Sequence, residues 1–559
     1  MKRWGYFIPC GIGIFLLLSL LRFPDGSIGH DYHHAFVRFL IGANHFWKNG
    51  FSLPQYTASL CAGEPFLADP QSTYFSLTQW LVFWMEPWLA TLFTVALFAL
   101  LGYLGFLALL KESLQIRGAV AHFVSLAFLL NGFTYAHLLV GHLTHHGFFL
   151  APWLLWAFFR RKTPIILVSF LWTYLVYSGA LHVGVVFIFM VFIAAPLILL
   201  VHAERKTLGS FLGRLIGVAF LTFLCTFAKI YAGWSYSSAF ISRAVETPAL
   251  SLFQLLEYYF WFTPSSTPHF LSVGEYDLGA WEFVAFVTKL TIPAILFGLA
   301  EFFRAKRGIK AALLWSGGMA LVTILIASGK LPNSSIPLLR GYHNPIKILG
   351  SLIPIFLLAL AWALSCLEKR FPFKIPRPLL FLGASLLLLA EFWQGAKFFR
   401  RIPEAGNFAW DSKSYQILKS NFPVVEKVSN NSSDLAGLLA GESSMNCYEP
   451  LFGYDQAGWK GEVVLGPTRQ IENGHFNLTH PGCLLYPDFF HCARWERIEE
   501  SDREAFEDLI AGKQPHWPLP WGQLILNWLT AATLLGMGSL PLLGHLNFLK
   551  RNRRKMPKR

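Results

Sequence analysis

The sequence predicts an all-α polytopic membrane protein that carries a small α/β domain outside the membrane. The chain has 559 residues, of which 54% are hydrophobic and only 14% are charged, whereas about a quarter of the residues of a globular domain are charged. Its mean hydropathy is +0.46. Several apolar stretches reach the roughly 20 residues that cross a bilayer, and each must be a helix because its backbone groups have no water to pair with.

About twelve spans are expected from these apolar stretches. They are predicted at residues 6–22, 86–110, 118–138, 146–159, 164–178, 182–202, 211–231, 282–303, 310–328, 346–366, 377–395 and 520–548. The chain then divides into a transmembrane domain at 1–395 with a long outer loop at 23–85, an extracytoplasmic domain at 396–519, and a final segment at 520–559 that holds one helix and a basic tail.

Lys and Arg residues gather in short clusters between the predicted spans. The loops expected on the opposite side, 139–145 and 179–181, carry neither residue. Because positively charged loops stay in the cytoplasm, both termini are predicted to be cytoplasmic. The net charge of +14 follows from these clusters, so nucleic acid is excluded as a partner.

The extracytoplasmic domain at 396–519 has a mixed pattern. "GEVVLGPTRQI" and "CLLYP" predict strands, and "ESDREAFEDLIAG" predicts a helix with a Ser cap and a Gly stop. Four cysteines are expected on the outer side, where disulfides form: Cys61, Cys447, Cys483 and Cys492. A Cys483–Cys492 pair is favoured, although four cysteines allow three pairings.

The first outer loop begins with "GHDYHHAFVRFL", followed by helical spacing over residues 31–47. Its polar face holds Asp31, His34 and Arg38, and its apolar face is rich in phenylalanine, which predicts an amphipathic helix resting in the membrane interface. Asp31 stands at the start of this helix. It is either a helix N-cap or a carboxylate that faces a lipid head group.

Two further acids of this loop, Glu64 and Asp69, lie in a segment punctuated by Gly and Pro and are therefore expected on turns. Acidic turns hold divalent cations through oxygen ligands, and solvated loop acids are the commoner alternative. The metal candidates from sequence are thus Asp31, Glu64 and Asp69, joined by His145.

"GHLTHHGFF" places His142, His145 and His146 at another outer edge. His142 and His146 are four residues apart and would share a helix face, as two metal ligands can. The alternatives are capping of helix ends, and contact with an acceptor or a phosphate.

Basic residues also occur near predicted outer ends of spans, against the topology rule. "IPLLRGYHNPIKILG" contains Arg340, His343 and Lys347, and Lys229 lies near the outer end of the seventh predicted span. A buried Arg suits a phosphate because its guanidinium donates two hydrogen bonds at once. Snorkelling to lipid head groups is the alternative for these side chains.

Together these outer segments resemble the GT-C-type integral-membrane glycosyltransferases, and most closely the bacterial YfhO-like membrane proteins. The resemblance is carried by "LPQYTASLCAGEPFLADPQSTYF", "AHLLVGHLTHHGFFLAPWLLWAFFRRK", "YSGALHVGVVF" and the segment around "GYHNPIK", and it covers about residues 1–395. The chain departs from the family at "GYHNPIK", where a shorter R-x-P-x-R is usual.

The resemblance implies an inverting transferase of the bacterial inner membrane. Such an enzyme moves a sugar from a polyprenyl phosphate to an acceptor outside the cytoplasm: a cell-envelope glycan, a lipid or a protein. It implies that Asp31 is the general base or a metal ligand, with a divalent cation as a candidate cofactor. The other polar residues named above would bind donor lipid and acceptor.

Two alternatives belong to other classes. A transporter or flippase of a lipid-linked intermediate should show paired repeats and helices broken at mid-membrane, and the sequence indicates neither. A non-catalytic membrane scaffold, which would bind a partner through 396–519, predicts that Asp31→Ala leaves function intact.

Overall fold

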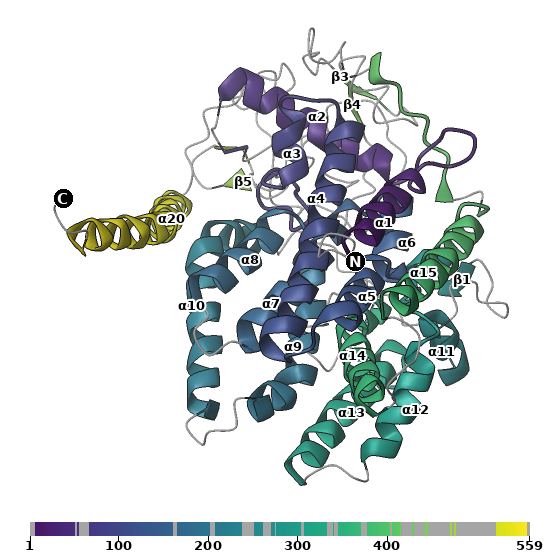
Figure 1. Ribbon diagram of the computed structural model, residues 1–559. Coiled ribbons are helices and arrows are strands. Elements are labelled where there is room, and N and C mark those ends of the chain that lie inside the picture. The colour runs from purple at the N-terminus through teal and green to yellow at the C-terminus, as the bar shows by residue number, and fades with distance from the viewer. Residues whose placement is uncertain are drawn as a thin grey trace.

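The protein was analysed as a computed structural model, shown in Figure 1. The structure describes residues 6–50, 53–54, 57, 66–159, 165–201, 207–236, 251–260, 270–273, 276–302, 307–331, 339, 345–370, 377–402, 405–413, 415, 427–429, 442–444, 470–471, 475–476 and 521–555. Statements below refer to these residues.

Most described residues are helical. The α-helices are α1 Ile8–Ser19, α2 Tyr32–Asn49, α3 Leu77–Val82, α4 Pro87–Ala108, α5 Gly118–Leu129, α6 Gly132–Val140, α7 Ala151–Phe159, α8 Ile165–Tyr177, α9 Leu181–Val201, α10 Thr207–Tyr236, α11 Leu252–Phe260, α12 Thr291–Phe302, α13 Arg307–Ala327, α14 Leu352–Arg370, α15 Arg377–Phe399 and α20 Trp521–Lys555. Short 3₁₀ and π segments join them: η2 Leu109–Ser113, η3 Leu143–Leu150, η4 Ala280–Glu282 and η6 Pro345–Ser351.

Helices α4, α5 and α7 lie at the centre of the bundle, with α8 and α10 on one side and α12, α13 and α14 on the other (Figure 1). The span formed by α5 and α6, Gly118–Val140, is completely buried among the other helices. α20 is far from α10 in the sequence but packs on it. There the Thr530 hydroxyl accepts a hydrogen bond from the Ala228 backbone N–H at 3.2 Å, which anchors the last helix to the seventh predicted span.

The polytopic helical class predicted from the sequence is confirmed, and every predicted span overlaps a helix. In the described part of the chain, six helices are long and apolar enough to cross a membrane, and three shorter apolar helices accompany them. The number of about twelve spans therefore stays a prediction, as does the orientation of the termini.

The predicted span 118–138 coincides with one candidate span, Gly118–Val140. This span is built from two helices, α5 and α6, which meet at Leu130 and Asn131. The side chain of Asn131 accepts a hydrogen bond from the Thr134 N–H at 2.8 Å and donates one to the Phe128 carbonyl at 2.6 Å. Asn131 is thus the N-cap of a new helix within the buried span.

The predicted span 282–303 needs correction, because α12 begins only at Thr291. Residues 283–290 precede the helix, and the backbone N–H groups of Ala285 and Val287 donate to carbonyls of α11. Pro293, in the first turn of α12, is the type of residue that begins a helix. Glu282 therefore ends the 3₁₀ segment η4, ahead of the helix.

The helix predicted at 31–47 forms as α2, but its apolar face does not rest in lipid. Phe36, Phe39, Leu40 and Ala43 are at most 1% exposed. They are covered by protein: α2 packs on α3 and α4, and the Phe36 ring lies 4.9 Å from the ring of Trp410. An amphipathic pattern does not distinguish a lipid surface from a protein surface. The sequence therefore predicted lipid contact for a face that protein covers.

Strands are short. β1 Phe270–Val273 pairs antiparallel with β2 Tyr276–Gly279. Within 396–519, β3 Lys427–Ser429 pairs parallel with β4 Glu442–Ser444, and β5 Gln470–Ile471 pairs antiparallel with β6 His475–Phe476. β5 falls at the end of the predicted strand "GEVVLGPTRQI". The predicted helix of that domain and its three cysteines, Cys447, Cys483 and Cys492, lie outside the described residues, as does Cys61 of the first outer loop.

Candidate functional site

The start of α2 crosses the end of α6 at backbone contact. The Asp31 N–H donates to the Val140 carbonyl at 2.9 Å, and the Tyr32 hydroxyl donates to the Leu138 carbonyl at 2.6 Å. Two glycines permit this approach. A Cβ at Gly29 would lie 2.2 Å from the Leu139 oxygen, and one at Gly141, where φ is +109°, would lie 2.3 Å from the Tyr32 nitrogen.

This crossing places the Asp31 carboxylate against histidines and not against its own helix. Asp31 is the N-cap residue of α2, but its side chain makes no capping hydrogen bond. Its Oδ2 lies 2.7 Å from His142 Nε2, and its Oδ1 lies 3.3 Å from His30 Nε2. The Asp31 side chain therefore does not cap α2 by a hydrogen bond. The side chain remains 21% exposed.

The Asp31 carboxylate is held in its charged form. Burial raises its pKa, but the hydrogen bond from His142 and the charges of His142, His30 and His34 outweigh burial and hold the pKa at about 2. A carboxylate with favourable partners is stabilised as the anion. Asp31 is consequently ionised at neutral pH.

A second carboxylate, that of Glu282, faces the same histidines from η4, ahead of α12. Its Oε2 lies 2.8 Å from Lys347 Nζ on η6, and its Oε1 lies 3.6 Å from His142 Nδ1. Burial raises the pKa of Glu282, but Lys347 and the neighbouring histidines hold it well below its ordinary value. The Lys347 predicted to bind phosphate is thus paired with an acid.

Three imidazoles complete this group. The rings of His137 and His145 are stacked with centroids 3.8 Å apart, and the ring of His142 lies 5.4 Å from His137 and 5.7 Å from His145. We call Asp31, His137, His142, His145, Glu282 and Lys347 the histidine cluster. Burial and the neighbouring cations lower the pKa of His145 well below its usual value, so its ring is neutral.

The sequence paired the wrong histidines. It placed His142 and His146 on one α-helical face, but η3 is a 3₁₀ helix, in which residues three apart are superposed. His142 therefore meets His145. His146 points elsewhere: its Nδ1 contacts the Leu143 carbonyl, and its Nε2 lies 2.7 Å from the Tyr174 hydroxyl. With both nitrogens engaged, His146 is a packing residue.

Arg38, Asp69 and Lys229 form a separate group, here called the arginine cluster. Arg38 Nη1 lies 3.0 Å from Asp69 Oδ2. Lys229 is only 5% exposed, and its Nζ donates to the Ser72 carbonyl at 3.3 Å, so it does not snorkel to head groups. Asp69 is engaged by Arg38, and its predicted role as a metal ligand stays a prediction.

Some of the remaining predicted site residues are described by the structure and others are not. His34 lies on α2 with its ring 5.2 Å from that of His33. Glu64, Arg340 and His343 lie outside the described residues. His137 and Glu282 were missed by the sequence reasoning. His137 stands in the quoted segment "AHLLVGHLTHH" and was available as a third histidine, whereas Glu282 was hidden inside a predicted span.

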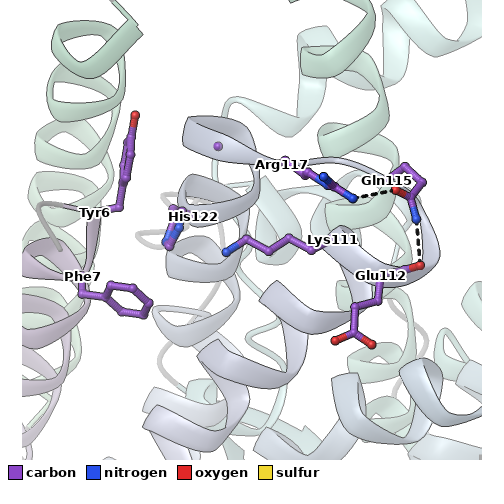
Figure 2. Close-up of a pocket in the computed structure, with 8 residues that line it drawn as sticks. Tyr6, Phe7, Lys111, Glu112, Gln115, Arg117 and His122 are labelled. Atoms are coloured by element: carbon purple, nitrogen blue, oxygen red, sulfur yellow. Dashed lines mark hydrogen bonds between the residues drawn. The ribbon is translucent and has the colours of Figure 1, made fainter. Parts of the chain in front are cut away.

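A cleft of about 800 Å³ lies at the other end of the α5–α6 span, lined by Tyr6, Phe7, Lys111, Glu112, Gln115, Arg117, Gly118 and His122. Figure 2 shows the Arg117 guanidinium bonded to the Gln115 side-chain oxygen, and the Gln115 amide bonded to the Glu112 carbonyl. His122 lies on α5 and His137 on α6, and no residue of the histidine cluster lines the cleft, so the two are distinct.

No protein-family model matches the sequence, and no curated protein matches it either. Among solved structures, the fold is similar to the arabinofuranosyltransferase AftD from Mycobacteria, with 18% identity and a TM-score of 0.43 over 77% of this chain and 30% of AftD. It is also similar to the archaeal oligosaccharyltransferase AglB from Archaeoglobus fulgidus, with 12% identity and a TM-score of 0.38 over 84% of this chain and 62% of AglB.

The chain thus spans less than two thirds of either neighbour. Both neighbours are glycosyl-transferring enzymes, the class to which the sequence resemblance points. TM-scores below 0.5 are too low to carry an argument about function, and the specific likeness to YfhO-like proteins stays a prediction. What this chain does is therefore argued from its own site.

Proposed function

We propose that the chain is an integral-membrane glycosyltransferase that passes a sugar from a polyprenyl phosphate to an acceptor outside the cytoplasm, with Asp31 as the working carboxylate. The observation that supports this most directly is the state of Asp31. The Asp31 carboxylate is ionised and partly exposed, and it lies beside the end of a buried span. It makes no capping hydrogen bond to its own helix, α2. Charged groups of this kind in membrane proteins are costly and mark functional sites.

The chemistry suits the residues at hand. The acceptor oxygen attacks the anomeric carbon, the bond from that carbon to the phosphate oxygen breaks, and the acceptor proton passes to Asp31. Because the pKa of Asp31 is about 2, the carboxylate is a weak base at rest. We assign it the task of orienting the hydroxyl and taking the proton late, when the new bond has made that hydroxyl acidic.

In this proposal, Lys347 and the arginine cluster supply the cations that face the departing phosphate. Lys347 Nζ lies beside Glu282, and Arg38 and Lys229 lie on α2 and α10. Positive groups aimed at a leaving phosphate stabilise the charge that develops on it. The predicted contribution of Arg340 and His343 belongs to this step.

The test is Asp31→Asn in membranes supplied with a polyprenyl-phosphate-linked sugar. Loss of a positioned general base costs about 10²–10⁴ in rate, so transfer should fall by that factor at normal expression. Asp25→Asn is the matched control, because Asp25 is an exposed acid of the same loop whose Oδ1 only accepts bonds from Ser27. Transfer at the wild-type rate in Asp31→Asn would exclude the catalytic role.

The break at Asn131 favours the alternative of a lipid-linked-sugar transporter, since transporters use broken helices at their binding sites. The two functions differ in the bond that changes. A flippase returns the donor lipid with its sugar attached, whereas the transferase releases the free polyprenyl phosphate. Analysis of the lipid product by mass spectrometry separates them, and intact donor lipid on the outer face would favour transport.

A further inference from the structure

The three imidazoles of the histidine cluster face one common point. His137 comes from α6, His142 from the turn after it, and His145 from η3. One ring nitrogen of each can be chosen so that all three atoms lie within 4.8 Å of one another. Such convergence of ring nitrogens is the first requirement of a metal site.

The opposite nitrogen of each ring is already fixed. His137 Nδ1 lies 2.8 Å from the Phe133 carbonyl, His145 Nδ1 lies 3.3 Å from the His142 carbonyl, and His142 Nε2 lies 2.7 Å from Asp31 Oδ2. Because these partners are acceptors, each nitrogen carries the proton. Metal-ligating histidines are oriented in this way, by a carbonyl or a carboxylate on the far nitrogen.

The lone pairs therefore remain on His137 Nε2, His142 Nδ1 and His145 Nε2. In the described part of the chain, these three atoms are buried side-chain atoms without a hydrogen-bond partner. Three acceptors cannot satisfy each other, and buried polar atoms are rarely left unpaired. What the site lacks is an electron-pair acceptor at its centre.

An oxygen ligand stands beside them. Glu282 Oε1 lies 3.6 Å from His142 Nδ1, and Glu282 Oε2 lies 3.8 Å from His137 Nε2. Asp31 and Glu282 bring two carboxylates to the cluster, against the single ammonium group of Lys347. Carboxylates in excess over ammonium groups attract a dication.

We propose that His137, His142 and His145 bind one divalent transition-metal ion of the zinc class, with Glu282 as the oxygen donor. Imidazole nitrogen selects Zn²⁺, Co²⁺ or Ni²⁺ over Mg²⁺ and Ca²⁺, which prefer oxygen. Two ligands held 2.1 Å from a tetrahedral ion are about 3.4 Å apart, so the three histidines would have to move closer together to bind an ion than they are in this structure.

The metal candidates from sequence were Asp31, Glu64, Asp69 and His145, and this assignment keeps only His145 among them as a ligand. Asp31 orients the ligand His142 through its far nitrogen and does not touch the ion. The metal site also stands apart from the proposed transferase reaction, because its test measures bound metal and not sugar transfer. An inactive protein that binds zinc would leave the inference intact.

The experiment uses the full chain, purified in detergent with a tag free of histidine, stripped by a chelator and titrated with Co²⁺. We expect one Co²⁺ per chain, with the intense visible absorption of a tetrahedral site, displaced by Zn²⁺ and unaffected by excess Mg²⁺. X-ray absorption of the Zn²⁺-loaded wild type should report three nitrogen neighbours of imidazole type. Absence of stoichiometric binding, or fewer than two imidazoles at the ion, would overturn the proposal.

Substitutions then locate the site. His145→Asn retains a donor near the Nδ1 position for the His142 carbonyl but removes the ligand nitrogen, so Co²⁺ binding should be lost. His122→Asn is the matched control, a buried histidine at the far end of the span whose Nδ1 bonds the Tyr103 hydroxyl. It should retain binding. Asp31→Asn should weaken binding 10–100-fold, as is typical for the outer partner of a ligand.

Discussion

The histidine cluster and the arginine cluster are both buried groups of opposite charges, yet they differ in how completely they are satisfied. In the arginine cluster, Arg38 pairs directly with Asp69 and Lys229 donates to a carbonyl. In the histidine cluster, three ring nitrogens face inward without partners. A satisfied network stabilises the loop that it ties down. An unsatisfied one, kept at a cost to stability, indicates a place for a ligand.

The largest effect that would sharpen this contrast is expected from Arg38→Met. It leaves the 3% exposed Asp69 side chain without its ion-pair partner, and breaking a buried pair costs about 3–5 kcal/mol. Melting of the variant in detergent measures the loss. The control is the double variant Arg38→Met with Asp69→Asn, which removes both charges and should recover part of the stability. A double variant no more stable than Arg38→Met would show that the pair is not the source.

In the histidine cluster, Lys347→Met should have an effect that depends on metal. Without metal, Glu282 loses the cation 2.8 Å away, at a cost of about 3 kcal/mol, the lower end for a broken buried pair. With Zn²⁺ bound, the ion supplies the missing positive charge, and the cost should be smaller. Melting with and without Zn²⁺ gives both values. Equal losses would remove the distinction drawn between the two clusters.

Gly141→Ala tests whether backbone contact holds Asp31 at the cluster. The left-handed backbone costs a residue with a Cβ about 1–2 kcal/mol, and the Cβ would also meet the Tyr32 nitrogen at 2.3 Å. Gly26→Ala isolates the first effect, because Gly26 has φ +88° with open space around it. The Gly141 variant should melt lower than the Gly26 variant and lose Co²⁺ affinity. Equal behaviour would mean that the crossing tolerates displacement.

The smallest effect is expected from Tyr174→Phe. It removes the hydroxyl that bonds His146 Nε2 at 2.7 Å and should lower stability by about 1 kcal/mol. Co²⁺ binding should be unchanged, because His146 is outside the cluster. A drop in metal affinity comparable with that of His145→Asn would instead connect His146 to the site.

The sequence was sufficient for the helical class, but not for the composition of the candidate site. Hydropathy averages over a whole helix, so it places helices well. It does not reveal that residues 143–150 form a 3₁₀ segment, in which a change from 3.6 to 3 residues per turn exchanges His146 for His145. Glu282 was not recognised as a site residue, because the apolar run FVAF joins it to the predicted span that follows.

Contacts between distant segments were the other missing element. Nothing local in Gly29 or Gly141 shows that they meet, and without that crossing Asp31 reads as a helix cap. The first turn at Pro293 was a usable signal for the true start of α12. Convergence of α2, α6, η3, η4 and η6 on one point is a property of the fold, and no window along the chain contains it.

The end of α6 has a consequence for the electrostatics beside the histidine cluster. The peptide dipoles of this helix sum to roughly half a negative charge at its last carbonyls. That end is at Val140, directly beside His142. The field at this helix end attracts a cation whatever the state of the side chains. Neutralising Glu282 by Glu282→Gln should therefore weaken Co²⁺ binding less than removing a ring nitrogen does.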